Sequence, residues 1–64
     1  MICENILILR KKRNLTQEAL AEAVGVTRQT IGLIEAGEFN PSIKLCVAIC
    51  KALGVTLNDI FWEE

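Results

Sequence analysis

Residues 16–37 read TQEALAEAVGVTRQTIGLIEAG, and they carry the strongest indication of the fold in this sequence. Apolar residues recur at helical spacing on both sides of Gly25, a residue suited to the left-handed turn that ends a helix. Ala21 is small enough to let two helices cross closely. The stretch therefore predicts two short helices, at 17–24 and 28–36, joined by a tight turn.

The signal that starts these helices recurs along the chain. Thr16, Thr27 and Thr56 each follow an apolar residue and precede another by four positions, as a capping threonine within a hydrophobic staple does. Asp59 completes an acidic capping box with Thr56, and Ser42 is the cap expected for a further helix. Each of these positions predicts a helix start.

Glycines predict where the helices end, because Gly25, Gly37 and Gly54 each follow a stretch with apolar residues at helical spacing. Asn14 tolerates the same left-handed turn and can end the first helix. The chain is predicted to be an all-α, compact five-helix domain spanning 1–64, with helices at 2–13, 17–24, 28–36, 43–53 and 57–61. Helical-wheel positions predict a core lined at its edge by Arg10 and Arg13 and composed of Ile2, Ile6, Leu9, Leu20, Val26, Ile31, Ile34, Ile43, Cys46, Val47, Cys50, Leu53, Ile60 and Phe61.

Composition excludes several classes of protein. With 64 residues, no His and no Tyr, the chain offers no nucleophile–base pair, so we expect no enzyme, no cofactor and no small-molecule ligand. No apolar run is long enough for a membrane span and no signal-peptide pattern is present, which favours the cytoplasm. The net charge is −1, yet residues 10–44 hold six of the seven cations and four of the eight acids. The middle of the chain is mildly basic.

The three cysteines are expected to be free thiols. Cys46 and Cys50 lie four residues apart in an apolar helical stripe, and Cys3 is remote in sequence. An (i, i+4) pair does not favour a disulfide, and without His or a C-x-x-C pair no metal site is expected. Small buried hydrophobes is the favoured interpretation.

Five short motifs occur along the chain in the same order as in a known family of proteins. They are Leu-Thr-Gln-Glu-x-Leu-Ala at 15–21, Gly-Val-Thr-Arg-Gln-Thr-Ile at 25–31, Ile-Glu-x-Gly at 34–37, Asn-Pro-Ser at 40–42 and Leu-Gly-Val at 53–55. Over about residues 5–61 the sequence resembles the phage-repressor and Cro type of helix-turn-helix protein, the xenobiotic-response-element family. This resemblance implies a DNA-binding domain whose third helix, 28–36, enters the major groove of double-stranded DNA. The sequence departs from the family at Asn14, commonly Gly, at Gly32-Leu33, usually a polar pair, and at Leu7-Ile8, usually charged.

The outward arc of the third helix is predicted to read bases. Arg28 and Gln29 suit bidentate contacts with guanine and adenine, respectively. Gly32 would let the backbone approach the groove, and Leu33 would meet a thymine methyl group. A solvated surface is the alternative for an isolated Arg-Gln pair, but the helix-turn-helix context favours base reading.

Phosphate contacts are expected near helix starts. Gln17 looks like the family's backbone-clamping glutamine, and the other candidates are Thr27, Asn40, Ser42 and Lys44. The run Lys11, Lys12 and Arg13 is more simply a solvated surface. The resemblance also suggests that Arg10 and Glu35 form a structural ion pair, which would fix the first helix against the third.

Apolar residues that the fold leaves unexplained predict a homodimer. Leu7 and Ile8 lie away from the core arc of the first helix, and the last helix cannot bury Leu57, Phe61 and Trp62 together with Ile60. A two-fold dimer would read a palindromic site, and the function expected is that of a transcriptional regulator. The alternative is a protein-interaction adaptor or antitoxin-like component with the same fold, which an acidic or apolar surface around Arg28 would favour.

Overall fold

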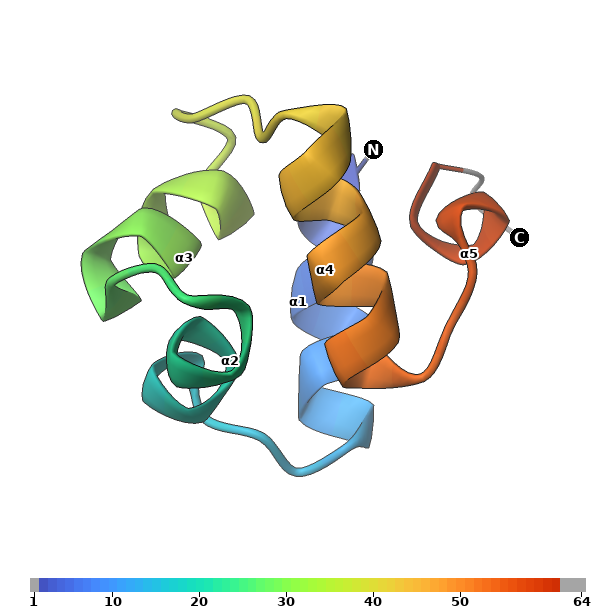
Figure 1. Ribbon diagram of the computed structural model, residues 1–64, viewed down its shortest axis with the longest axis horizontal. Coiled ribbons are helices and arrows are strands. Elements are labelled where there is room, and N and C mark those ends of the chain that lie inside the picture. The colour runs from blue at the N-terminus through green and yellow to red at the C-terminus, as the bar shows by residue number, and fades with distance from the viewer. Residues whose placement is uncertain (1, 62–64) are drawn as a thin grey trace.

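The computed structural model describes the backbone of residues 2–61 and the side chains of residues 5–60. Five α-helices make up this part of the chain, and no strand occurs in it. In chain order they are α1 (Ile2–Lys12), α2 (Gln17–Val24), α3 (Arg28–Glu35), α4 (Ile43–Leu53) and α5 (Leu57–Phe61) (Figure 1). The all-α prediction is confirmed, and the predicted helix boundaries differ by at most one residue.

The predicted caps explain where the helices begin. The side-chain oxygens of Thr16, Thr27 and Ser42 accept hydrogen bonds from the backbone N–H three residues later, at 3.0, 3.2 and 3.1 Å. At the start of α5 the Asp59 carboxylate accepts from the backbone N–H and the hydroxyl of Thr56, at 2.9 and 3.2 Å. Each contact satisfies a polar group that a helix start would otherwise leave unpaired.

Two left-handed residues set the chain reversals on either side of α2. Gly25, between α2 and α3, has φ of +81°, and its N–H donates to the Ala21 carbonyl at 2.9 Å. Asn14, between α1 and α2, has φ of +58° and is the one residue other than glycine with positive φ in the described chain. Asparagine adopts this conformation more readily than most residues, so the departure from glycine at position 14 is tolerated.

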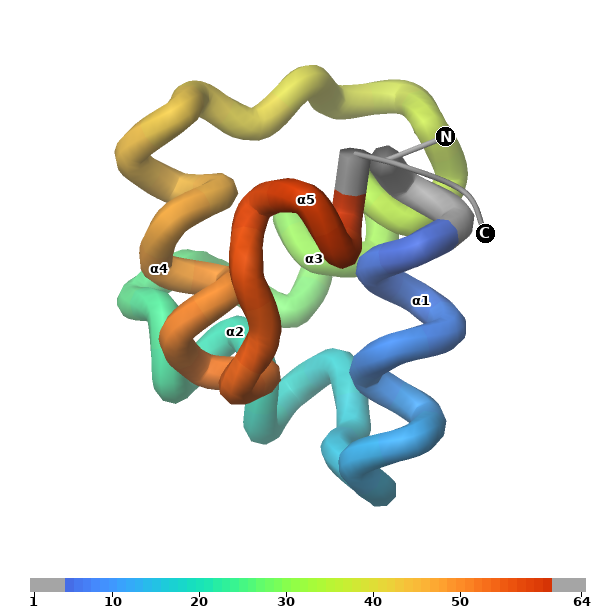
Figure 2. The backbone as a smooth tube through the Cα atoms, turned by 90° about the vertical axis from the view of Figure 1, so that its right-hand side faces the viewer, coloured from blue at the N-terminus to red at the C-terminus, as the bar shows by residue number. Residues whose placement is uncertain are grey.

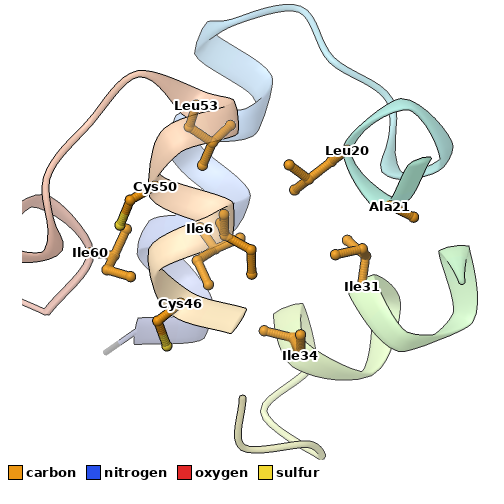
Figure 3. Close-up of a cluster of buried hydrophobic side chains, with 10 residues drawn as sticks. Ile6, Leu20, Ala21, Ile31, Ile34, Cys46, Cys50, Leu53 and Ile60 are labelled. Carbon is orange, nitrogen blue, oxygen red and sulfur yellow. The ribbon is translucent and has the colours of Figure 1, made fainter. Parts of the chain in front are cut away.

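The core lies where α2, α3 and α4 meet α1 and α5 (Figure 3). Its fully buried side chains come from all five helices and include Ile6, Leu20, Ile31, Ile34, Ile49, Leu53, Ile60 and Cys46. Ala21 is also buried, where α2 packs against α3. Its small side chain permits the close crossing that the sequence predicted.

One core assignment on α4 is wrong. Ile43 was expected in the apolar stripe, but it is 64% exposed, because it stands at the first position of α4, beyond the packed part of the helix. Ile49, absent from the predicted stripe, is fully buried instead, and Val47 is half-buried. The buried face of α4 is therefore rotated from the predicted one. Ile2 and Phe61, also assigned to the core, lie outside the described side chains.

α5 closes the domain beside α1 and α4 (Figure 2). The Asn5 side-chain amide donates to the Ile60 carbonyl at 3.1 Å, which ties α5 to α1 across most of the chain length. α2 and α3 lie on the opposite side of α4, at the left of Figure 1. This arrangement leaves the outer surface of α3 open to solvent while its inner surface is buried.

Candidate nucleic-acid interface

The two faces of α3 differ in both burial and chemistry. Ile31 and Ile34 are at most 1% exposed and hold the helix on the core. Arg28 and Gln29, at the first turn, are exposed, and the first turn contains no acidic residue. The structure thus presents hydrogen-bonding side chains outward from a helix whose position is fixed by apolar burial. We call Gln17, Arg28 and Gln29 the polar face.

Arg28 does not extend freely into solvent. Its Nη1 donates a hydrogen bond to Oε1 of Gln17 at 2.9 Å. Gln17 is the first residue of α2, so this contact joins the starts of the two helices of the helix-turn-helix. The guanidinium keeps further N–H groups available for a ligand, because arginine carries five.

Gln17 is held in turn by Glu35 at the other end of α3. The Nε2 atom of Gln17 donates to Oε1 of Glu35 at 2.9 Å. Arg28 and Glu35 are seven residues apart, two helical turns, so they lie on the same side of α3. Gly32 lies between them on that side, and a Cβ built there would be 3.8 and 3.9 Å from the two polar atoms of the Gln17 amide.

The position of Gln17 gives Gly32 a second explanation. The sequence suggested that glycine here lets the backbone approach DNA, whereas in the structure the Gln17 side chain rests against this part of the helix. A methyl group would be in ordinary van der Waals contact, but a longer side chain would compete with the amide for the same space. Gly32 and Leu33 are both half-buried.

Arg10 and Glu35 form the ion pair that the family resemblance implied. Arg10 Nε donates to Glu35 Oε2 at 2.6 Å and Arg10 Nη2 donates to Oε1 at 3.1 Å. Nη1 of Arg10 also donates to the Leu15 carbonyl at 2.8 Å. The two side chains are only 9% and 5% exposed, so solvent screens the bidentate pair weakly. α1 is thereby joined to the end of α3 and to the loop before α2.

The remaining phosphate candidates lie at or near two helix starts. Thr27 and Ser42 are the exposed N-caps of α3 and α4, and Asn40 and Lys44 are exposed close to the second of these. The Thr27 hydroxyl also forms a hydrogen bond with the Thr30 hydroxyl at 3.0 Å. Helix N-termini present free N–H groups and a positive dipole end, both of which favour phosphate.

The residues expected at a dimer interface are in different environments. Ile8 is 47% exposed and Leu7 is half-buried, and we call these two residues the apolar face of α1. Leu57 is half-buried and packs against the domain's own core. Phe61 and Trp62 lie outside the described side chains.

The two described cysteines are buried free thiols. Burial raises the pKa of Cys46. The pKa of Cys50 is raised mainly by burial, and further by the negative charges that Cys46 and Asp59 carry when deprotonated. Both thiols are therefore poor nucleophiles at neutral pH. The prediction that they act as small hydrophobes in the core is confirmed, while the Cys3 side chain lies outside the described part.

Two features of this surface were missed by sequence reasoning. Phe39, in the loop between α3 and α4, is 44% exposed, and no helical period drew attention to it. The contacts of Gln17 with Arg28 and Glu35 join residues 11 and 18 positions apart. Only the folded arrangement brings these side chains together, so no local pattern in the sequence indicated the contacts.

Comparison with known proteins agrees with this geometry. The helix-turn-helix family model HTH_3 matches residues 6–60. An uncharacterized HTH-type transcriptional regulator of Bacillus subtilis, YgzD, is 48% identical over 56 residues, which are 88% of this chain and 85% of that protein.

Two solved structures have the same fold. The P22 c2 repressor, determined in complex with a synthetic operator, matches with a TM-score of 0.88 and 32% identity, over 94% of this chain and 91% of that one. The restriction-modification controller protein C.AhdI of Aeromonas hydrophila matches with a TM-score of 0.90 and 28% identity, over the same shares.

The relatives that match are described as HTH-type transcriptional regulators, a phage immunity repressor and an antitoxin rather than as enzymes, in agreement with the expectation from the sequence. Within residues 2–61, no helix is both long and apolar enough to cross a membrane. The buried inner surface of α3, the close α2–α3 crossing and the family match over residues 6–60 lead to one conclusion. The chain belongs to the phage-repressor and Cro type of helix-turn-helix DNA-binding domains.

Proposed function

We propose that this protein regulates transcription by binding double-stranded DNA sequence-specifically as a homodimer, with α3 in the major groove. One observation carries the proposal: the first turn of α3 exposes Arg28 and Gln29 while Ile31 and Ile34 fix the helix on the core. A groove-reading helix needs this combination of a fixed position on the core and exposed hydrogen-bonding side chains.

The exposed side chains match the chemistry of base edges. A guanidinium can donate two hydrogen bonds to O6 and N7 of guanine, and the Gln29 amide can both donate to and accept from adenine. Leu33 is positioned one turn later, where an apolar side chain can meet a thymine methyl group. Arg28 and Gln29 are assigned the base-reading role, with Gly32 and Leu33 beside them.

Phosphate contacts would set the register of α3 on the duplex. The exposed N-caps Thr27 and Ser42, together with Asn40 and Lys44, can donate from the starts of α3 and α4. Gln17 is the fifth candidate. These contacts would supply affinity that depends little on sequence, and Lys44, the cation among them, would make part of that affinity depend on salt.

The apolar face of α1 supports the dimer. Ile8 exposes nearly half of its surface at a position where solvent offers it no favourable contact. Burial against a second copy would remove that surface from water and relate two α3 helices by a two-fold axis. Two recognition helices about 34 Å apart would read a palindromic site.

Binding-site selection from random duplexes tests this function. We expect the enriched sequences to share an inverted repeat whose half-sites are separated by about one helical turn. Enrichment of single half-sites would contradict the dimer alone. A pool with no sequence enriched over the input would contradict sequence-specific DNA binding.

A further inference from the structure

The two hydrogen bonds by which the Gln17 amide links Arg28 to Glu35 can run in one direction only. A carboxylate accepts and cannot donate, so Glu35 requires the Nε2 end of the Gln17 amide, at 2.9 Å. The Oε1 end of Gln17 must then point the other way, where it accepts from Arg28 Nη1 at 2.9 Å. Glu35 thereby determines which end of the Gln17 amide faces Arg28.

The far end of this chain of contacts is firmly held. Glu35 is bound by two nitrogens of Arg10, and its side chain is 5% exposed. Arg10 is anchored separately on the Leu15 carbonyl. Because Gly32 has no side chain, the Gln17 amide can lie across α3 between Glu35 and Arg28. An exposed arginine is thus connected through two hydrogen bonds to a buried ion pair.

We infer that Glu35 is a positioning residue for DNA reading, which orients Arg28 through Gln17. This inference rests on the function proposed above. Arg28 would enter the groove already oriented, since one N–H is held by Gln17 and the others remain free for a base. A side chain ordered in advance loses less conformational freedom on binding, and the saving applies only where its preferred base is present. The buried ion pair therefore contributes to base preference as well as to stability.

A purely structural ion pair makes a different prediction. In that case loss of Glu35 would lower affinity for every duplex equally, through the stability of the domain. A Gln17 that only contacts phosphate would likewise weaken binding to all sequences. Orientation of Arg28 requires instead that both changes reduce the preference at the base pair that Arg28 reads.

Three variants separate these outcomes. Gln17→Met removes both amide hydrogen bonds at a half-buried site with a side chain of similar length. Arg10→Met with Glu35→Leu removes the anchor while leaving no unpaired charge in the interior, so we expect the domain to remain folded. Ile49→Val is the control. It lowers the stability of the core through α4, a helix that contributes no residue to the hydrogen bonds joining Glu35, Gln17 and Arg28.

The measurement is a ratio of two dissociation constants for each variant. One duplex is the site selected by the wild type, and the other differs at the base pair for which Arg28→Ala loses preference. We expect a wild-type ratio of about tenfold or more. Gln17→Met and the Arg10–Glu35 double variant should both fall below about threefold, while Ile49→Val retains the wild-type ratio.

Each alternative result has a separate meaning. If Gln17→Met and the Arg10–Glu35 double variant both keep the wild-type ratio, with affinity lowered equally for the two duplexes, the inference is overturned and the proposed function remains intact. A full ratio in the double variant alone would remove Glu35 from the positioning of Arg28 and equally overturn it. A wild type that does not distinguish any duplexes would contradict the proposed function, and the inference with it.

Discussion

The polar face of α2 and α3 and the apolar face of α1 expose side chains in opposite ways. On the polar face Gln17 and Arg28 are held by directional hydrogen bonds to one another and to Glu35. On the apolar face Ile8 exposes 47% of its surface and gains only by removal from water. The first arrangement suits a ligand with fixed donors and acceptors, and the second suits another apolar surface. The proposed DNA and dimer contacts follow this division.

The largest effect is expected at Glu35, which holds Gln17 of the polar face by a hydrogen bond. Glu35→Ala leaves the guanidinium of Arg10 buried without its partner and removes the acceptor of Gln17, so we expect the free energy of unfolding to fall by about 3–5 kcal/mol. Replacing Arg10 by Met and Glu35 by Leu together should recover much of that loss. Thermal and urea unfolding of the single and double variants measure this. Losses that simply add would show that the two side chains do not stabilise one another.

Salt should weaken DNA binding through the exposed cations of the proposed interface. If Arg28 and Lys44 each neutralise one phosphate, raising the salt from about 50 to 200 mM should weaken DNA binding by about tenfold per half-site. The reason is that each neutralised phosphate releases a condensed counterion. Fluorescence anisotropy across this range gives the slope. An association constant that does not change with salt would exclude DNA phosphates as the ligand.

The apolar face is tested by a charge placed on it. Ile8→Lys should weaken dimer formation by about tenfold, because the apolar burial is lost and two like charges meet across the two-fold axis. Ile43→Lys is the matched control, since Ile43 is 64% exposed on α4 and lies outside the proposed interface. Sedimentation equilibrium at micromolar concentration compares the two. A wild type that is monomeric throughout would remove the proposed role of this face.

The smallest effect is expected at Lys44, a phosphate candidate outside the polar face. Lys44→Ala removes one exposed cation near the start of α4, so affinity should drop by a few-fold on all duplexes and the salt slope should decrease by about one. The measurement is the same salt titration on a selected and an unrelated duplex. A change in base preference would place Lys44 among the base-reading residues.

Local signals predicted most of the fold, because the interactions that start and end short helices are themselves local. Thr16, Thr27 and Ser42 cap their helices as their positions in the sequence predicted. The prediction for Ile43 is wrong because burial at the start of α4 depends on how far α2 and α5, the helices packed against α4, extend along it. The residues next to Ile43 in the sequence do not indicate how far the core extends along the helix.

The candidate site was less accessible to sequence reasoning. Burial separates the two sides of α3 by simple periodicity, so Arg28 and Gln29 were identified as outward residues. Periodicity does not indicate that Gln17 reaches across Gly32 to both Arg28 and Glu35. The Arg10–Glu35 pair was expected only from the family resemblance, since 25 positions separate its members.

Binding-site selection repeated with Arg28→Ala tests most directly whether the first turn of α3 reads bases. We expect the wild type and the variant to enrich related sites that differ at one base pair in each half-site. At that base pair the variant should lose about 1–3 kcal/mol of discrimination, while its thermal stability stays near that of the wild type. Identical enriched sequences from the two proteins would contradict base reading by Arg28, because this side chain would then contribute nothing to the choice of DNA.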